Sequence, residues 1–241
     1  MIASLPVKIR ERLAALDWDA IGASLDTRGW AKTPVVLTAN ECAALAEMWP
    51  NDARFRKRID MASHAYGEGG YGYFKTPLPP LVREMRIAAY RPLAEVANRW
   101  AAKLGQETRF PKALAAFLKE CHARGQTRPT PLLLRYETGG FNCLHRDLYG
   151  DVVFPLQLTC FLSRRGVDYD GGDFMLIEQR PRAQSRGEVI PGEQGEIVIF
   201  AVRDRPAKSK RGFYRAALRH GVATITRGER YALGIIFHDA A

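Results

Sequence analysis

The stretch FNCLHRDLYGD, residues 141–151, alternates apolar and polar side chains in the manner of a half-buried β-strand. In such a strand His145 and Asp147 point to the same face, and Arg146 points to the other. Two interpretations are open: a buried histidine paired with a carboxylate, or two ligands of one metal ion. Cys143 shares this face and is more simply read as a packing residue, because free cysteine behaves as a small hydrophobe.

The region around this stretch predicts many short strands. Between residues 131 and 241, eight apolar or alternating runs are separated by turns rich in Gly, Asp and Arg: PLLLRYE, CLHRDLY, FPLQLTCFLS, GDFMLIE, GEVIP, GEIVIFAV, HGVATIT and RYALGIIFH. Short strands at this spacing are typical of a β-sandwich or jelly roll.

Residues 1–130 are predicted to be mainly helical. The spacing of apolar residues predicts helices over residues 6–25, 38–49, 80–104 and 111–123. Thr38 and Glu41 form a capping box at the start of the second, and Pro92 predicts a kink or break in the third. Residues 63–80 are too rich in glycine for a helix and predict a loop or hairpin. We expect an α+β fold: one domain over residues 1–241, with helices packed on a double-stranded β-helix, the jelly roll.

Composition narrows the functional classes. The 241 residues include 36 Lys and Arg against 26 Asp and Glu, a net charge of +10 that favours polyanionic partners. No run approaches the roughly 20 apolar residues that cross a bilayer, and charges interrupt the N-terminal segment early. We therefore expect a cytoplasmic protein that does not enter a membrane. The four cysteines form no C-x-x-C pair and are expected to be reduced.

Histidines and one arginine on the later strands favour the metal interpretation. Of the five histidines, three lie in the strand-rich region: His145, His220 and His238. His220 opens one predicted strand, and Arg230 follows ten residues later at the start of the last. Two imidazoles and a carboxylate can form a facial triad, which leaves three positions of an octahedral metal open and is diagnostic of non-haem Fe(II) oxygenases.

With these motifs in this order, the chain resembles the 2-oxoglutarate and Fe(II)-dependent dioxygenase superfamily, whose pattern is H-x-D, a distant His, then Arg or Lys on the following strand. The resemblance covers most of residues 130–239 and rests on LLLRYETGGFNCLHRDLYG, YDGGDFMLIE, GEIVIF and RHGVATITRGERYALGIIFHD. Within the superfamily, GEGGYGYF…PLP upstream of LRYETGGFNCLHRD is most similar to a bacterial family described as acting in oxidative demethylation of damaged DNA, with AlkB-like activity.

The resemblance implies a role for each matching residue. His145, Asp147 and His220 would hold Fe(II), 2-oxoglutarate would chelate it through its 1-carboxylate and keto oxygen, and O₂ would take the last position. Arg230 would pair with the far carboxylate, for which a guanidinium fork is well shaped. Tyr136 either touches the co-substrate or is a core aromatic. Strand alternation adds Thr159 and Gln157 as candidates for the pocket wall.

The implied reaction converts 2-oxoglutarate to succinate and CO₂ and hydroxylates a C–H bond; on an N-methyl group, the product releases formaldehyde. Alkylated DNA or RNA is one substrate class, and prolyl, protein or small-molecule hydroxylation is the alternative. Tyr71 and Tyr73 in residues 63–80 could stack on a base. Arg211, in the basic segment 203–219 that is expected near the mouth of the site, could contact phosphates. A packed lid and a solvated basic face are the simpler explanations of these two segments.

Two rival classes remain. A basic nucleic-acid-binding β-protein that is not an enzyme would make the H-x-D pattern accidental, and it predicts neither iron binding nor 2-oxoglutarate turnover. A cupin-type jelly roll with another metal usually brings three histidines and a glutamate, and it leaves Arg230 unexplained.

Overall fold

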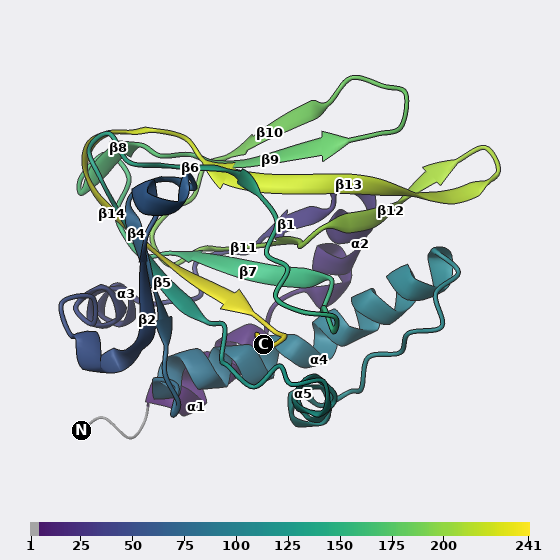
Figure 1. Ribbon diagram of the computed structural model, residues 1–241, viewed down its shortest axis with the longest axis horizontal. Coiled ribbons are helices and arrows are strands. Elements are labelled where there is room, and N and C mark those ends of the chain that lie inside the picture. Colours follow the sequence, from purple (N-terminus) through teal and green to yellow (C-terminus); the bar gives the residue numbers. More distant parts are fainter. Residues whose placement is uncertain (1–4) are drawn as a thin grey trace.

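The computed structural model describes residues 5–241, with side chains from residue 8 (Figure 1). Five α-helices are present in this part of the chain: α1 (Leu5–Ala14), α2 (Trp18–Arg28), α3 (Ala39–Ala46), α4 (Pro80–Lys103) and α5 (Leu114–Ala123). The capping box of α3 forms as predicted, because the Thr38 hydroxyl accepts from the Glu41 amide and the Glu41 carboxylate accepts from the Thr38 amide. None of the described helices is both long and apolar enough to span a membrane.

Two antiparallel sheets face each other above the helices in Figure 1. The larger has the order β1-β11-β7-β14-β5-β4-β2, with β8 beside β14, and its strands are β1 (Trp30–Lys32), β2 (Phe55–Asp60), β4 (Gly70–Phe74), β5 (Leu132–Glu137), β7 (Leu156–Phe161), β8 (Tyr169–Gly171), β11 (Ile197–Ala201) and β14 (Ile225–Ile236). The smaller has the order β10-β9-β13-β6-β3, with β12 beside β13, and its strands are β3 (Gly67–Glu68), β6 (Phe141–His145), β9 (Phe174–Gln179), β10 (Arg186–Ile190), β12 (Asp204–Ser209) and β13 (Gly212–Val222). The predicted jelly roll with packed helices is confirmed.

The first half of the chain contributes more strands than predicted. β2 and β4 extend the large sheet beyond β5. The sequence predicts no strand at β2, and β4 lies within residues 63–80, for which it predicts a loop or hairpin. Gly72 permits this addition, because a Cβ there would lie 2.6 Å from the Phe55 ring, which packs across β4. The Gly-rich run therefore serves as a strand whose missing side chains make room for a neighbouring aromatic ring.

The helix α4 is continuous through Pro92, where the sequence predicts a kink or break. It lies on the side of the large sheet away from the small one, and its buried Tyr90 packs against Phe154 and Phe237 (Figure 1). Arg86 of the same helix donates to the carbonyl oxygens of Ile236 and Phe237. The helix is thereby fixed to the end of β14, the strand that carries Arg230.

The C-terminal half differs from prediction around β13. HGVATIT was expected to be one strand, but β13 ends at Val222 and β14 begins at Ile225. β13 also begins earlier, at Gly212, and pairs with β12 along its whole first half. The basic segment 203–219 is therefore mostly a β-hairpin, which was hidden in the sequence because many of its outward-facing residues are Lys or Arg.

Candidate metal centre

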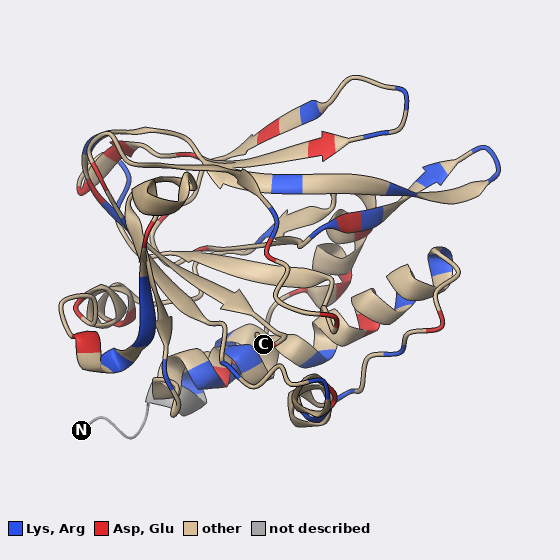
Figure 2. Cartoon of the chain, viewed as in Figure 1, with Lys and Arg blue, Asp and Glu red and all other residues tan. Residues whose placement is uncertain are grey.

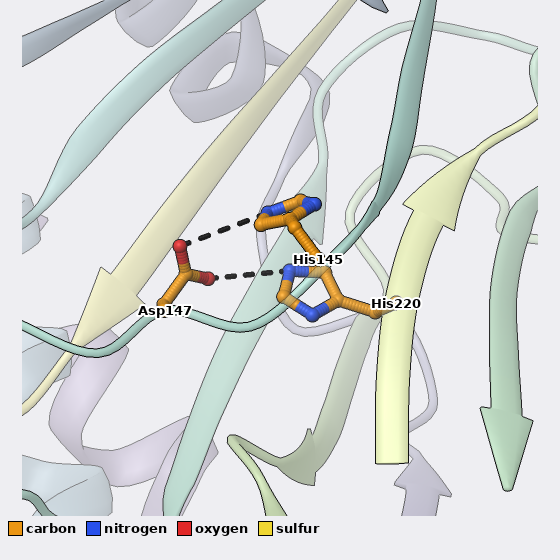
Figure 3. A group of neighbouring side chains, drawn as sticks. All are labelled: His145, Asp147 and His220. Carbon is orange, nitrogen blue, oxygen red and sulfur yellow. Dashed lines mark ion pairs between the residues drawn. The ribbon is translucent and has the colours of Figure 1, made fainter. Parts of the chain in front are cut away.

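Three side chains from two strands and one loop converge between the sheets (Figure 3). His145 is the last residue of β6, and it lies directly opposite His220 on the neighbouring β13. Asp147 follows in the loop after β6. Its Oδ2 lies 3.2 Å from Nε2 of His220, and its Oδ1 lies 3.7 Å from Nε2 of His145. The ligand atoms of all three residues lie within 4.8 Å of one another.

An irregular strand register explains why His145 faces the interior although Cys143, two residues earlier, is exposed. His220 is opposite His145, but Val222 is opposite Asn142, so β6 holds one extra residue between the two pairs. Such a bulge redirects side chains, and bulges are frequent beside active sites. Asn142 accordingly donates to the hydroxyl of buried Tyr136 at 3.2 Å, and Cys143 is exposed.

Gly221, the residue after His220, faces the bulge across the strand pair. A Cβ at this position would lie 2.7 Å from the carbonyl oxygen of Asn142, closer than real Cβ atoms approach an oxygen. The glycine therefore allows β13 and β6 to come together at the two histidines.

The donor set fits a divalent metal ion. Bonds of about 2.0–2.2 Å to imidazole and carboxylate place neighbouring ligand atoms roughly 3 Å apart in a compact site, close to the separations found here. Burial favours a raised pKa for Asp147, but the hydrogen bond and charge of His220, then His145 and Tyr149, hold its pKa well below the usual range. Burial, together with His145, lowers the pKa of His220. An anionic carboxylate and a neutral imidazole are the forms that bind metals.

Asp147 is oriented by a tyrosine that the sequence analysis missed. The hydroxyl of Tyr149 donates to Asp147 Oδ1 at 2.7 Å, and the hydroxyl of Tyr73 donates to that of Tyr149 at 3.0 Å. Since β6 ends at His145, strand geometry does not fix Asp147, and these hydrogen bonds hold its carboxylate instead. The signal in the sequence was an aromatic residue two positions after Asp147, which was read as part of an alternating strand.

A cavity of about 410 Å³ opens beside the three side chains, and Arg230 lies at its inner wall. Arg230 is 1% exposed, and none of its three guanidinium nitrogens has a hydrogen-bond partner among the described residues. Its guanidinium carbon lies 5.6 Å from the ring centres of Tyr136 and Phe161 and 5.9 Å from that of Tyr169. A buried cation without a counter-ion is costly, so this group is suited to an anionic ligand that enters the cavity.

Most of the residues predicted for the pocket line this cavity. Tyr136, Thr159, Gln157 and Tyr71 all contribute to its wall, as do the small residues of β14 that follow Arg230. Gln157 keeps a buried amide nitrogen without a partner among the described residues, so a donor is available there. The cavity therefore offers a cation at its inner wall, polar groups on β7 and aromatic rings from β4 and β5.

Two predicted substrate residues lie elsewhere. Tyr73 is buried behind the cavity wall, where it bonds to Tyr149. Arg211 lies in the turn between β12 and β13 and is not among the residues that line the cavity. The segment 203–219 was expected near the mouth of the site, but it extends away along β13 (Figure 1).

Comparison with known proteins identifies the family. Residues 69–240 match the family model Oxygenase-NA, described as an oxygenase catalysing oxidative methylation of damaged DNA. The chain is 50% identical over 168 residues to the uncharacterized proteins MT2286 and Rv2227 of Mycobacterium tuberculosis, a match that covers 70% of this chain and 72% of each relative.

Solved structures that share the fold include the following two. A prolyl-4-hydroxylase of Pseudomonas putida superposes with a TM-score of 0.56 at 18% identity, over 93% of this chain and 99% of that one. An oxidoreductase of the 2OG-Fe(II) oxygenase family from Burkholderia pseudomallei gives 0.55 at 16% identity, over 93% of both chains. The chain is an enzyme that belongs to the Oxygenase-NA family of oxygenases, and its fold is that of the 2-oxoglutarate and Fe(II)-dependent oxygenases.

Proposed function

We propose that this protein is a 2-oxoglutarate- and Fe(II)-dependent oxygenase that hydroxylates alkyl groups on nucleic acid. The observation that carries the proposal is the joint placement of two features in one cavity. His145, Asp147 and His220 form a compact donor set, and the guanidinium of Arg230 is buried there without an acceptor. The same cavity can accept a metal ion and an anion attached to it.

In this proposal His145, Asp147 and His220 would hold the iron. Arg230 would pair with the far carboxylate of 2-oxoglutarate, and Thr159 and Tyr136 line the same cavity. Bound iron supplies the activation of O₂ that couples decarboxylation of 2-oxoglutarate to oxidation of a C–H bond. The aromatic wall excludes water from the reacting centre.

Nucleic acid is the substrate class best supported. The description of the family names damaged DNA, and the net charge of +10 favours a polyanion. Tyr66 and Tyr71 line the cavity, and Tyr66 is 49% exposed, so aromatic faces are available to stack on an extruded base. Hydroxylation of an N-methyl group gives a hydroxymethyl product that releases formaldehyde and restores the nitrogen. Removal of methyl groups from alkylated bases is accordingly the proposed reaction.

The test measures succinate after purified protein is mixed with Fe(II), ascorbate and 2-oxoglutarate. We expect wild type to form succinate and His145→Ala to form almost none, whereas His122→Ala, at a half-exposed histidine outside the cavity, retains the activity. A folded wild type that forms no succinate with any candidate substrate would overturn the dependence on 2-oxoglutarate.

A second assay separates the substrate classes. We expect formaldehyde from methylated single-stranded DNA and no gain of 16 Da on proline-containing peptides, a difference that follows from the added oxygen atom (about 16 Da). Hydroxylation of peptides without any formaldehyde from nucleic acid would contradict the substrate assignment and leave the cofactor assignment standing.

A further inference from the structure

Most of the net charge of the protein, +7 of +10, lies on two β-hairpins of the small sheet. Residues 178–188 and 203–219, the β9–β10 and β12–β13 hairpins, hold ten Lys and Arg against three Asp and Glu. The rest of the chain holds 26 Lys and Arg against 23 Asp and Glu, so it is close to neutral. Figure 2 shows blue residues along both hairpins, which project together beyond the body of the protein, and further blue residues on β2 and α4. We call them the basic hairpins.

The two hairpins are joined at their base. Glu178 of β9 accepts from Nε of Arg205 in β12 at 2.6 Å, and both side chains are buried. β9 pairs directly with the second half of β13, so the hairpins share a continuous sheet. On the other side, the ammonium of Lys103 at the end of α4 lies 5.4 Å from the ring centre of Phe213. These contacts fix the direction in which the hairpins project.

Some cations of the basic hairpins are paired with carboxylates and others are not. Arg203 and Arg215 pair with Asp204, and Arg180 pairs with Glu178. Arg186 pairs with Glu188. By contrast, no carboxylate among the described residues lies within ion-pair distance of Arg182, Lys208, Lys210 and Arg211, which are exposed near the turns, or of exposed Arg219, which precedes His220. Cations that no internal partner neutralises are available to an external anion.

The distance from the metal centre determines what these cations can contact. From His220 to Gly212, β13 runs straight for eight residues, about 26 Å at roughly 3.3 Å per residue. This is about eight nucleotide steps of a duplex strand, which rises about 3.4 Å per step. The tips are too far away to hold the nucleotide that reacts in the cavity, and they are well placed for phosphates that flank it.

The surface between the cavity and the hairpins provides a path. Leu148, in the loop after Asp147, lines both the catalytic cavity and a second hollow of about 600 Å³. Arg203 and Arg215, at the base of the β12–β13 hairpin, line that second hollow. A strand that leaves the cavity past Leu148 therefore meets the basic hairpins next.

We propose that the basic hairpins form a second nucleic-acid contact, which binds the phosphate backbone several nucleotides away from the reacting base. The inference rests on the proposed function, because it assumes a polynucleotide substrate. It predicts that the protein distinguishes long from short strands and that it does so through Lys208, Lys210 and Arg211. The recognition is of phosphate charge, so it does not depend on base sequence.

The test compares two triple variants of the full chain that lose the same charge. Lys208→Ala/Lys210→Ala/Arg211→Ala removes three cations at the hairpin turn, and Arg91→Ala/Lys112→Ala/Lys119→Ala removes three exposed cations from α4, α5 and the loop between them. Fluorescence anisotropy measures the Kd of each for an unmodified strand of 30 nucleotides and for one of five. The unfolding temperature of each variant verifies its fold.

We expect the hairpin variant to lose three phosphate contacts on the long strand, which lowers the salt slope of log Kd by about 2–3. At 0.1 M salt this corresponds to roughly 100-fold weaker binding. Its Kd for the five-nucleotide strand should stay within about twofold of wild type, and the control variant should change both values little. Equal weakening by the two variants would overturn the inference, since net charge alone would explain it.

Two further results separate this inference from the proposed function. Release of formaldehyde from DNA with unchanged long-strand binding in the hairpin variant would refute the hairpin contact and leave the function intact. Tighter binding of wild type to polyglutamate than to the 30-nucleotide strand would point to an acidic protein partner and refute the hairpin contact. Hydroxylation of peptides with no binding to either strand would refute both proposals.

Discussion

Replacing Arg230 by methionine should stabilise the protein in the absence of 2-oxoglutarate. The buried guanidinium meets no acceptor among the described residues, and an unpaired buried polar group costs about 1–3 kcal/mol. Cation–π contacts with the surrounding rings offset about 0.5–1 kcal/mol of this cost, and hydrogen bonds to water in the cavity offset a further part. The net gain is up to about 2 kcal/mol, which at roughly 2–4 °C per kcal/mol for a chain of this length should raise the unfolding temperature by up to about 8 °C.

With 2-oxoglutarate bound, wild type should instead unfold at a higher temperature than Arg230→Met. At about 100 times its Kd, a ligand that binds only the native state contributes about 2.7 kcal/mol, which would raise the unfolding temperature of wild type by roughly 5–11 °C. Arg230→Met loses the charge-assisted pair with the far carboxylate and should gain almost nothing. Thermal unfolding, followed by circular dichroism with Mn(II) in place of Fe(II) to prevent turnover, measures both effects.

The control is Arg227→Met, because Arg227 is exposed on the same strand and pairs with Asp170. This variant should respond to 2-oxoglutarate as wild type does. If Arg230→Met unfolds below wild type without the co-substrate, the guanidinium is not an uncompensated charge and the reasoning is wrong. If 2-oxoglutarate raises its unfolding temperature as much as that of wild type, the carboxylate binds elsewhere.

Three other perturbations test the structure around the centre. Tyr149→Phe removes the hydrogen bond to Asp147 and should weaken Mn(II) binding about 10–100-fold, measured by calorimetry; an unchanged Kd would mean that the tyrosine does not orient the carboxylate. Gly221→Ala places a Cβ against the backbone of β6 and should cost about 1–3 kcal/mol in urea unfolding, whereas Gly187→Ala, which meets only a movable side-chain end, should cost less. Burial favours a raised pKa for Glu178, but its arginine partners lower the pKa below its usual value. The contribution of Glu178 to stability is therefore present above its unfolded pKa of about 4.3 and is lost as the pH falls. In Glu178→Gln the urea midpoint should vary less with pH between about pH 5 and 3 than in wild type, and the same pH dependence in both proteins would contradict this.

The sequence was most informative where function depends on local periodicity. Alternation placed His145 and the polar side of β7 toward the interior, and the structure has Thr159 and Gln157 on the cavity wall. The strand that carries Arg230 was also predicted, because its apolar run is long, whereas the strand that carries His220 begins at Gly212 and ends at Val222 instead of starting at His220. In each case the pattern lies within a few consecutive residues, and strand geometry then determines the face to which each side chain points.

The features that were missed depend on partners distant in the chain. Whether β2 and β4 join a sheet depends on the free edge of β5, and no local pattern reports that edge. The bulge in β6 is defined by its pairing with β13. The residue that permits this pairing, Gly221, lies 78 positions after Cys143 in the sequence. The β12–β13 hairpin was obscured by its charges, which suit a solvated strand face as well as a loop.

The position of Asp147 links these two kinds of information. Strand alternation from His145 correctly predicts the face to which the Asp147 carboxylate points. However, β6 ends at His145, so strand geometry is not what orients that carboxylate. Tyr149 and Tyr73 orient it through two hydrogen bonds, and Tyr73 comes from β4, in the segment 63–80 for which the sequence predicts a loop or hairpin. The added strand is therefore part of the support of the metal centre. This explains why a Gly-rich segment far from the H-x-D motif packs against the same cavity: it carries the last member of the chain of hydrogen bonds that fixes the carboxylate.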